Sequence, residues 1–196
     1  MEIVRYPHPA LRWVSKPVRE VNDEIRRIAA EMLELMYAAK GIGLAANQVA
    51  LPMRMFVLNA TKAEPPDRAH ERVFINPQIV ERKGLVEAEE GCLSLPEVFA
   101  TLKRAERIKV TALGLDGSPF ELEAEGLTAR AIQHESDHLS GILFTDKLNP
   151  LEKIRIIGKI REMERDFRHS QEAGQTPSND ALKRALGELE GVHCQL

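Results

Sequence analysis

The sequence predicts one α+β domain, in which mixed and largely antiparallel sheets surround a central helix and a C-terminal helix packs outside. The chain has 196 residues, a length typical of a single compact domain. Hydrophobic residues make up 43% and charged residues 29% of the sequence, which is typical of a globular protein with a buried core. The middle of the chain alternates apolar and polar residues, as strands do, and segments with helical periodicity precede and follow it.

The first regular element is an amphipathic helix over residues 22–40. Apolar residues recur at helical spacing between Ile25 and Met36, so one face of the helix can be buried. Asn22 can accept a hydrogen bond at the start of the helix, and Gly41 can end it.

Five strands follow, because five segments are rich in β-branched or alternating apolar residues. They are residues 53–58, 72–75, 79–89, 106–113 and 119–125. A Leu-Asp-Gly-Ser turn at 115–118 predicts that the last two form a hairpin. Residues 61–70 contain two prolines and several charged residues, so we expect an exposed loop there.

Two more helices complete the domain. A short helix over 128–139 is expected to be buried by the sheet, and a long one over 149–168 begins at Asn149 and Pro150, a cap followed by a proline at the first helical position. Residues 169–196 contain glycines and a proline, and we expect a poorly ordered or weakly helical tail.

Composition excludes several classes of protein and partner. The net charge of −3 and the pI near 6.1 give no overall attraction to DNA or to an anionic membrane. The two cysteines, Cys92 and Cys194, are far apart, which argues against a disulfide framework and favours a reducing compartment. No apolar run approaches the roughly 18 residues of a membrane span, and the N-terminus lacks the pattern of a signal peptide. We therefore expect a cytoplasmic protein.

The strongest chemical pattern is His-Glu-x-x-His at 134–138, on the short helix. Positions i and i+4 share a helix face, so His134 and His138 can bind one metal ion while Glu135 reaches a water held there. The alternative is a pair of surface histidines on an ordinary helix.

A catalytic metal site of this type needs a third protein ligand, and Cys92 is the best candidate. It follows a predicted strand within Glu-Gly-Cys-Leu-Ser-Leu-Pro at 90–96. Taken alone, a single cysteine is more often a small buried apolar residue. A third segment, Gly-Ile-Gly-Leu-Ala-Ala-Asn-Gln at 41–48, has small residues that allow close backbone approach and the amide of Gln48. Taken alone, it would be a helix end with a solvated glutamine.

In this order and at these separations, GIGLAANQ, EGCLSLP and QHESDHLSG resemble the three motifs of the peptide deformylase family. The resemblance covers about residues 1–168, so it implies a catalytic domain that includes the C-terminal helix. It implies hydrolytic removal of the formyl group from the N-formylmethionine of nascent proteins by a metal-activated water. The metal would be one divalent ion, commonly Fe²⁺ in this family, with Zn²⁺, Ni²⁺ or Co²⁺ able to replace it.

The resemblance also implies roles for individual residues. Cys92, His134 and His138 would be the metal ligands, and Glu135 would carry the proton. The side-chain amide of Gln48 and the backbone N–H of Leu93 would stabilise the oxygen of the formyl group. The residues implied near the methionine side chain or the substrate backbone are Ile42, Gly43, Glu90, Gly91, Leu127 and Ala131.

The sequence departs from the family at two positions near this pocket. Phe99 stands where many bacterial members have an arginine, which leaves the ion partner of Glu90 open. Arg130 replaces an apolar pocket residue and is expected to narrow or close one wall. Asp137 is either an acceptor for a ligating histidine or a solvated carboxylate.

Three alternatives concern function and partners. The helix over 149–168 mixes basic and acidic residues, so it is either a solvated face or, as the resemblance implies, a contact with the ribosome. A zincin-type endopeptidase shares His-Glu-x-x-His but usually takes its third ligand downstream, where residues 139–168 contain no histidine. A structural metal site normally fills all four positions with Cys or His, whereas the motifs supply three ligands.

Overall fold

The computed structural model describes residues 1–61 and 67–194. The helices are α1 (Asp23–Ala38), α2 (Gly126–His138), α3 (Pro150–Glu172) and α4 (Asn179–His193). The strands are β1 (Gly43–Ala45), β2 (Met55–Leu58), β3 (Arg72–Lys83), β4 (Val86–Cys92), β5 (Leu95–Arg104), β6 (Arg107–Leu113) and β7 (Pro119–Glu125). Short 3₁₀ helices lie at η1 (Pro9–Arg12), η2 (Ala46–Val49), η3 (Arg68–His70) and η4 (Phe144–Lys147).

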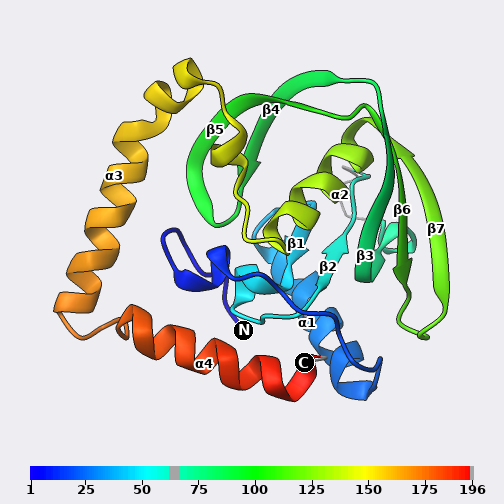
Figure 1. Ribbon diagram of the computed structural model, residues 1–196, viewed down its shortest axis with the longest axis horizontal. Coiled ribbons are helices and arrows are strands. Elements are labelled where there is room, and N and C mark those ends of the chain that lie inside the picture. Colours follow the sequence, from blue (N-terminus) through cyan, green and yellow to red (C-terminus); the bar gives the residue numbers. More distant parts are fainter. Residues whose placement is uncertain (62–66, 195–196) are drawn as a thin grey trace.

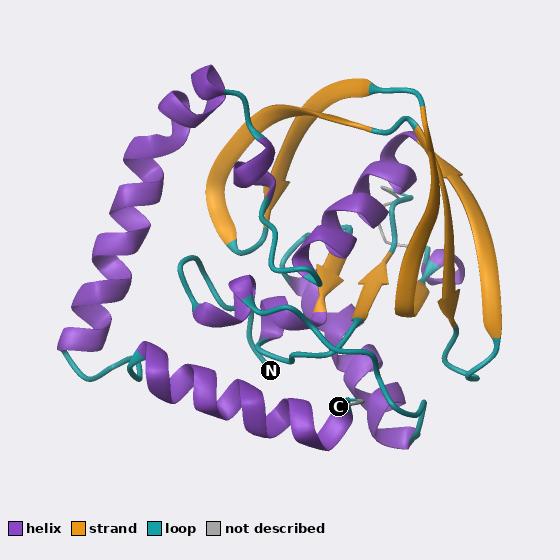
Figure 2. Cartoon of the chain, in the orientation of Figure 1, coloured by secondary structure: helices purple, strands orange, loops and turns teal. Residues whose placement is uncertain are grey.

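The strands form two separate sheets. Five of them pair in the order β1-β2-β3-β6-β7, and β4 and β5 form a hairpin of their own. All these pairings are antiparallel, and an isolated parallel bridge joins Lys16 to Met53. Figures 1 and 2 show α2 in the middle, with the larger sheet on one side and the curved hairpin arching over the other. This arrangement confirms the predicted α+β class.

Helix α2 is central because its apolar residues have partners on the larger sheet. Ala129 and Ile132 are fully buried in a cluster with Phe56 and Phe74, two stacked rings whose centroids are 4.6 Å apart. Burial of aromatic side chains contributes strongly to the stability of such a core. The packing fixes which face of α2 points away from the sheet, and that face carries the histidines.

Helix α1 covers a second core, as its amphipathic pattern predicts. The side chain of Asn22 accepts a hydrogen bond from the backbone N–H of Ile25 at 3.0 Å, which caps the first turn. Met32 and Met36 are fully buried against β1 and β2. Gly41 and Gly43 follow shortly after the end of this helix, so the packing of the helix determines the position of the first motif.

The strand predictions need correction in the region before the central helix. β3 is continuous through residues 76 and 77, where its pairing with β6 is irregular, and the chain turns at Gly84. The predicted strand over 79–89 therefore belongs partly to β3 and partly to β4. β5 was not predicted, because Pro96 weakens a strand pattern, and β1 was not predicted either, because it has only three residues and begins with a glycine. Part of the predicted loop over 61–70 lies outside the described residues.

The C-terminal segment also differs from expectation. Helix α3 packs the side chains of Ile156, Ile160 and Met163 against a cluster that includes β5. Instead of a poorly ordered or weakly helical tail, residues 179–193 form α4, which turns back beneath the N-terminal segment (Figure 1). Leu186 is buried, and Glu190 accepts a 2.7 Å hydrogen bond from the indole of Trp13. Tertiary contacts thus stabilise a segment whose glycines weaken local helix propensity.

Among residues 1–61 and 67–194, no helix combines the length and the apolar character that crossing a membrane requires.

Candidate active site

Three potential metal ligands meet beside the face of α2 that points away from the five-stranded sheet. The Sγ atom of Cys92 lies 3.3 Å from Nε2 of His138, and the Nε2 atoms of His134 and His138 are 3.2 Å apart. Ligand atoms of all three residues lie within 4.8 Å of one another. A thiolate and two imidazoles that converge in this way fit a divalent cation such as zinc or iron.

Two different elements supply these ligands. His134 and His138 project from successive turns of α2, as their spacing predicts. Cys92 ends β4, where the pairing with β5 becomes irregular between Gly91 and Cys92. This irregularity bends the strand end toward the helix, so the site forms only when the hairpin and α2 are held together.

His138 is suited to coordination because its ring stays neutral. It is 1% exposed, and burial lowers its pKa well below the ordinary value of 6.5. The Nδ1 atom of this ring has no hydrogen-bond partner among the described residues. The Nε2 atom, by contrast, faces the other two ligands.

Glu135 is a buried carboxylate next to the ligands. Burial raises its pKa to about 7, although His134 and Arg104 act in the opposite direction. One carboxylate oxygen, Oε2, has no partner among the described residues. Gly43 lies so close that a Cβ atom there would be 2.4 Å from Oε1. A carboxyl group with a pKa near neutrality can both accept and donate a proton.

Gln48 is held in a single orientation by the first motif. It belongs to η2, and its Oε1 accepts a 2.8 Å hydrogen bond from the backbone N–H of Ala45. Its Nε2 consequently points to the other side, 3.3 Å from Oγ of Ser94 and 3.5 Å from Sγ of Cys92. The amide donor therefore faces the site instead of solvent.

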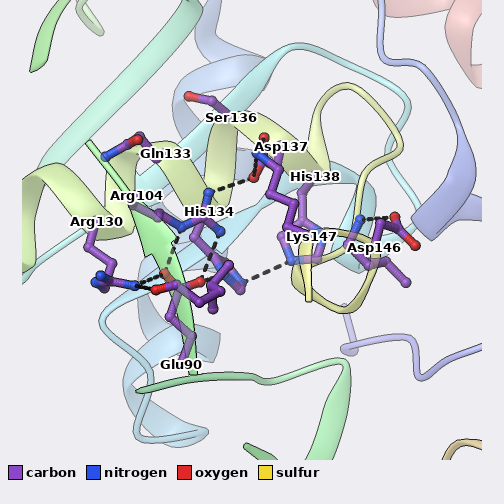
Figure 3. A network of polar contacts seen from close by, with 12 residues as sticks. Glu90, Arg104, Arg130, Gln133, His134, Ser136, Asp137, His138, Asp146 and Lys147 are labelled. Atoms are coloured by element: carbon purple, nitrogen blue, oxygen red, sulfur yellow. Dashed lines mark hydrogen bonds and ion pairs between the residues drawn. The ribbon is translucent and has the colours of Figure 1, made fainter. Parts of the chain in front are cut away.

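Glu90 has charged partners that the sequence did not reveal. Its carboxylate accepts hydrogen bonds from Arg104 at 2.6 and 2.9 Å and from Arg130 at 2.6 Å. Figure 3 shows both guanidinium groups directed at this carboxylate. Burial alone would raise the pKa of Glu90, but hydrogen bonds from His134 and Arg104 lower it to about 2. Glu90 is thus a buried anion, and the open question about its ion partner is answered by two arginines.

Glu90 also contacts the metal-site helix. Its Oε2 lies 3.2 Å from Nδ1 of His134, so it can accept a hydrogen bond from the N–H at Nδ1 and leave Nε2 free for a metal. Asp137 does not take this role, since it pairs with Arg104 at 2.6 Å and Lys147 at 2.7 Å. The orienting carboxylate therefore comes from the hairpin and not from the helix.

A cavity of about 750 Å³ opens next to the ligands. It is lined by all six residues that the resemblance implies for substrate contact: Ile42, Gly43, Glu90, Gly91, Leu127 and Ala131. Cys92, His134, Glu135, Gln48 and Leu93 line it as well. The residues predicted for catalytic and substrate roles thus share one cavity with the predicted ligands Cys92 and His134, while His138 lies buried behind them, with its Nε2 3.3 Å from Sγ of Cys92.

The two departures from the family lie at this cavity. Arg130 does not close it, because its guanidinium bonds to Glu90 and to the backbone carbonyls of β4. Phe99 pairs across the hairpin with Gly91 and is 59% exposed at the cavity wall. A Cβ atom on Gly91 would lie 2.6 Å from the ring, so the absence of a side chain makes room for it.

Comparison with known proteins identifies the chain's family. The family model described as polypeptide deformylase matches residues 1–154, which carry all three motifs. The chain belongs to the peptide deformylase family. Peptide deformylases are metal-dependent hydrolases that remove the formyl group from nascent peptides.

Solved peptide deformylases share the fold. A structure from Plasmodium falciparum is 36% identical, with a TM-score of 0.83, and the match covers 86% of this chain and 98% of that one. One from Legionella pneumophila is 38% identical over 84% and 95% of the two chains, with a TM-score of 0.77. One from Thermotoga maritima is 39% identical over 76% and 97%, with a TM-score of 0.71.

Proposed function

We propose that Cys92, His134 and His138 hold the divalent ion on which the deformylase reaction depends. The convergence of their ligand atoms within 4.8 Å carries this proposal. The neutral ring of His138 and the hydrogen bond of His134 to Glu90 support it, because a ligating imidazole must keep one nitrogen unprotonated. Three protein ligands leave room for water and substrate, as a catalytic site needs.

A divalent ion in such a site lowers the pKa of water and attracts electrons from a carbonyl oxygen. Within the chain, Glu135 takes a proton from the attacking water as the water oxygen bonds to the formyl carbon. Glu135 then gives that proton to the methionine nitrogen as the carbon–nitrogen bond breaks, which releases formate and a free amine. The pKa of about 7 and the unpartnered Oε2 of Glu135 support both transfers.

Negative charge develops on the formyl oxygen during the attack. We assign its stabilisation to Nε2 of Gln48 and the backbone N–H of Leu93. Support comes from the Ala45 hydrogen bond, which fixes the glutamine amide with its donor toward Cys92. Removal of one such donor typically lowers turnover by about 10²–10³-fold.

The substrate enters the cavity beside these groups. We assign Leu127, Ala131 and Ile42 to the wall that receives the methionine side chain, and Gly43 and Gly91 to the path of the peptide backbone. Glu90 lines the cavity but its carboxylate is occupied by two arginines, so its role there is to orient His134. Equal cleavage of formyl-methionyl peptides and of analogues with bulkier first residues would contradict this pocket.

Release of formate from formyl-Met-Ala-Ser tests the assignment of Glu135. Glu135→Ala is expected to retain one equivalent of metal and to lose most of its turnover, whereas Cys92→Ala is expected to lose the metal itself. Metal content by elemental analysis separates these outcomes. Turnover near that of the wild type in Glu135→Ala would refute the proton-transfer role.

We propose Fe²⁺ as the physiological ion, with Zn²⁺, Ni²⁺ and Co²⁺ as functional replacements. The mixed thiolate and imidazole ligands suit each of these ions. Anaerobic purification followed by metal analysis and the formate assay distinguishes them. Enzyme that retains zinc and loses no activity when iron is withheld would contradict the assignment.

We also propose a cytoplasmic location and a contact between α3 and the ribosome, from which the formylated substrate emerges. The outer surface of α3 exposes Leu151, Ile154 and Ile157, which is unusual for a helix that faces only water. Leu151→Glu with Ile154→Glu is expected to reduce co-sedimentation with ribosomes while formate release from a free peptide is retained. Equal pelleting of the double variant and the wild type rejects the contact.

A further inference from the structure

The two halves of the candidate metal site lie on elements that share no strand pairing. Cys92 belongs to the β4–β5 hairpin, and His134 and His138 belong to α2. Within residues 1–61 and 67–194, no ladder joins this hairpin to the five-stranded sheet that holds α2. The distance between the thiol and the imidazoles must therefore be set by side chains that bridge the hairpin and the helix.

Arg130 is such a bridge. It lies one turn before His134 on α2 and is 7% exposed. Its Nη1 donates to Oε1 of Glu90 at 2.6 Å and lies 3.4 Å from the carbonyl oxygens of Ala88 and Leu102, while Nη2 donates to the carbonyl oxygen of Val86 at 3.0 Å. One guanidinium thus connects the ligand-bearing helix to both strands of the hairpin.

Charge explains why Glu90 needs this second arginine. Arg104 is shared between Glu90 and Asp137, with contacts of 2.6 Å to each. Without Arg130, the buried carboxylate of Glu90 and the partly buried carboxylate of Asp137 would share one guanidinium, while the ammonium of Lys147 contacts Asp137. Arg130 gives Glu90 a second cation. Figure 3 shows the arginines reaching Glu90 from separate directions, which restrains the carboxylate that bonds His134.

We propose that Arg130 is a positioning residue of the deformylase reaction, which locks the β4–β5 hairpin onto α2 and thereby sets Cys92 and Glu90 relative to His134. This inference rests on the proposed set of metal ligands. From the sequence, Arg130 was expected to narrow or close one wall of the pocket. The proposal instead gives this residue a role in holding the hairpin against α2. Arginine is required because its planar fork can bond a carboxylate and a carbonyl together, whereas one ammonium group cannot span both.

The absorption spectrum of cobalt-loaded enzyme reports the metal site itself, so it separates a change at the site from a general loss of stability. A thiolate bound to Co²⁺ gives a charge-transfer absorption band, and the visible bands of the ion report the arrangement of its ligands. We expect Arg130→Met to weaken Co²⁺ binding about 10–100-fold, as loss of partners around metal ligands typically does, and to reduce the thiolate band. We expect Arg130→Lys to show the same defects to a smaller degree, and both to lower kcat for formyl-Met-Ala-Ser.

Arg54→Met is the matched control. Arg54 is half-buried, donates a 3.2 Å hydrogen bond to the carbonyl oxygen of Pro77, and is not among the residues that line the cavity. We expect loss of the Arg54 side chain to lower Tm without changing the Co²⁺ spectrum or the affinity for Co²⁺.

Absence of the thiolate band in the wild type would instead refute the ligand set and not the role of Arg130.

The decisive result is the metal site of Arg130→Met in folded protein. A wild-type spectrum with Co²⁺ affinity within twofold of the wild type overturns the proposal, whatever the change in Tm. If Arg130→Met does not fold, Arg130→Lys tests the proposal, because lysine keeps the positive charge and lacks the planar guanidinium group. Wild-type Co²⁺ spectrum and affinity in that variant would show that the bridge is not needed.

Discussion

Gly43→Ala should disable the enzyme by moving Glu135. A Cβ atom at residue 43 would lie 2.4 Å from Oε1, 2.9 Å from Cδ and 3.0 Å from Cγ of Glu135. Ordinary contact begins near 3.4 Å, so the carboxylate must retreat by about 1 Å. Glu135 is 4% exposed and fixed on a central helix, which leaves it little space to do so without losing its position. A displacement of about 1 Å typically costs about 10²-fold in rate.

Formate release and metal content measure this prediction together. We expect kcat for formyl-Met-Ala-Ser to fall about 100-fold, while one equivalent of metal remains, since the three atoms nearest to the new methyl group all belong to Glu135. Gly187→Ala is the control, because a Cβ atom at that helical position has no atom within 4 Å. A kcat within threefold of the wild type in Gly43→Ala would refute the claim that the position of Glu135 is critical.

Three further predictions concern stability. Arg104→Met leaves the buried carboxylate of Glu90 and the partly buried carboxylate of Asp137 each short of one partner and should cost about 3–5 kcal/mol in urea unfolding; a loss below about 1 kcal/mol would contradict the network. The pKa of Asp146 is lowered because its hydrogen bond with Arg12 outweighs the opposing influence of burial. This pair therefore stabilises the fold above about pH 4 and less as the carboxylate is protonated, so Arg12→Met should lower Tm more at pH 7 than at pH 3, and an equal effect would reject it. Leu186→Ala should destabilise by about 2–5 kcal/mol without changing kcat, whereas an unchanged urea midpoint would mean that α4 does not stabilise the domain.

Local patterns in the sequence predicted the elements whose determinants are local. The cap at Asn22 and the Asn149-Pro150 start locate α1 and α3 because each signal acts within one helical turn. β5 has the alternation of buried and exposed residues typical of a strand, but Pro96 and the left-handed backbone at Glu97 interrupt its start. Helix α4 has a local signal in Ser178, whose side chain accepts a hydrogen bond from the backbone N–H of Ala181, but the glycines of this segment weaken that signal and the helix also depends on Trp13 at the opposite end of the chain.

The same distinction holds within the active site. The spacing of His134 and His138 predicts a shared helix face, and the structure brings Cys92 to them. The partners of Glu90 were not predicted, since Arg104 and Arg130 are 14 and 40 residues away in sequence. Neither arginine belongs to a recognisable motif. Only the folded hairpin shows that both reach one carboxylate.

The positions of Arg104 and Arg130 explain the departure at Phe99. Phe99 lies on the exposed side of the hairpin, against Gly91, whereas Glu90 points inward to α2, so the side chain at position 99 does not face the carboxylate of Glu90. Adjacent residues of a strand face opposite sides, so the cation must come from the helix side or from the buried end of β5. Arg130 and Arg104 occupy those two places. The motif residues therefore supply the proposed ligands, while Arg104 and Arg130, outside the motifs, pair with the carboxylate that contacts His134.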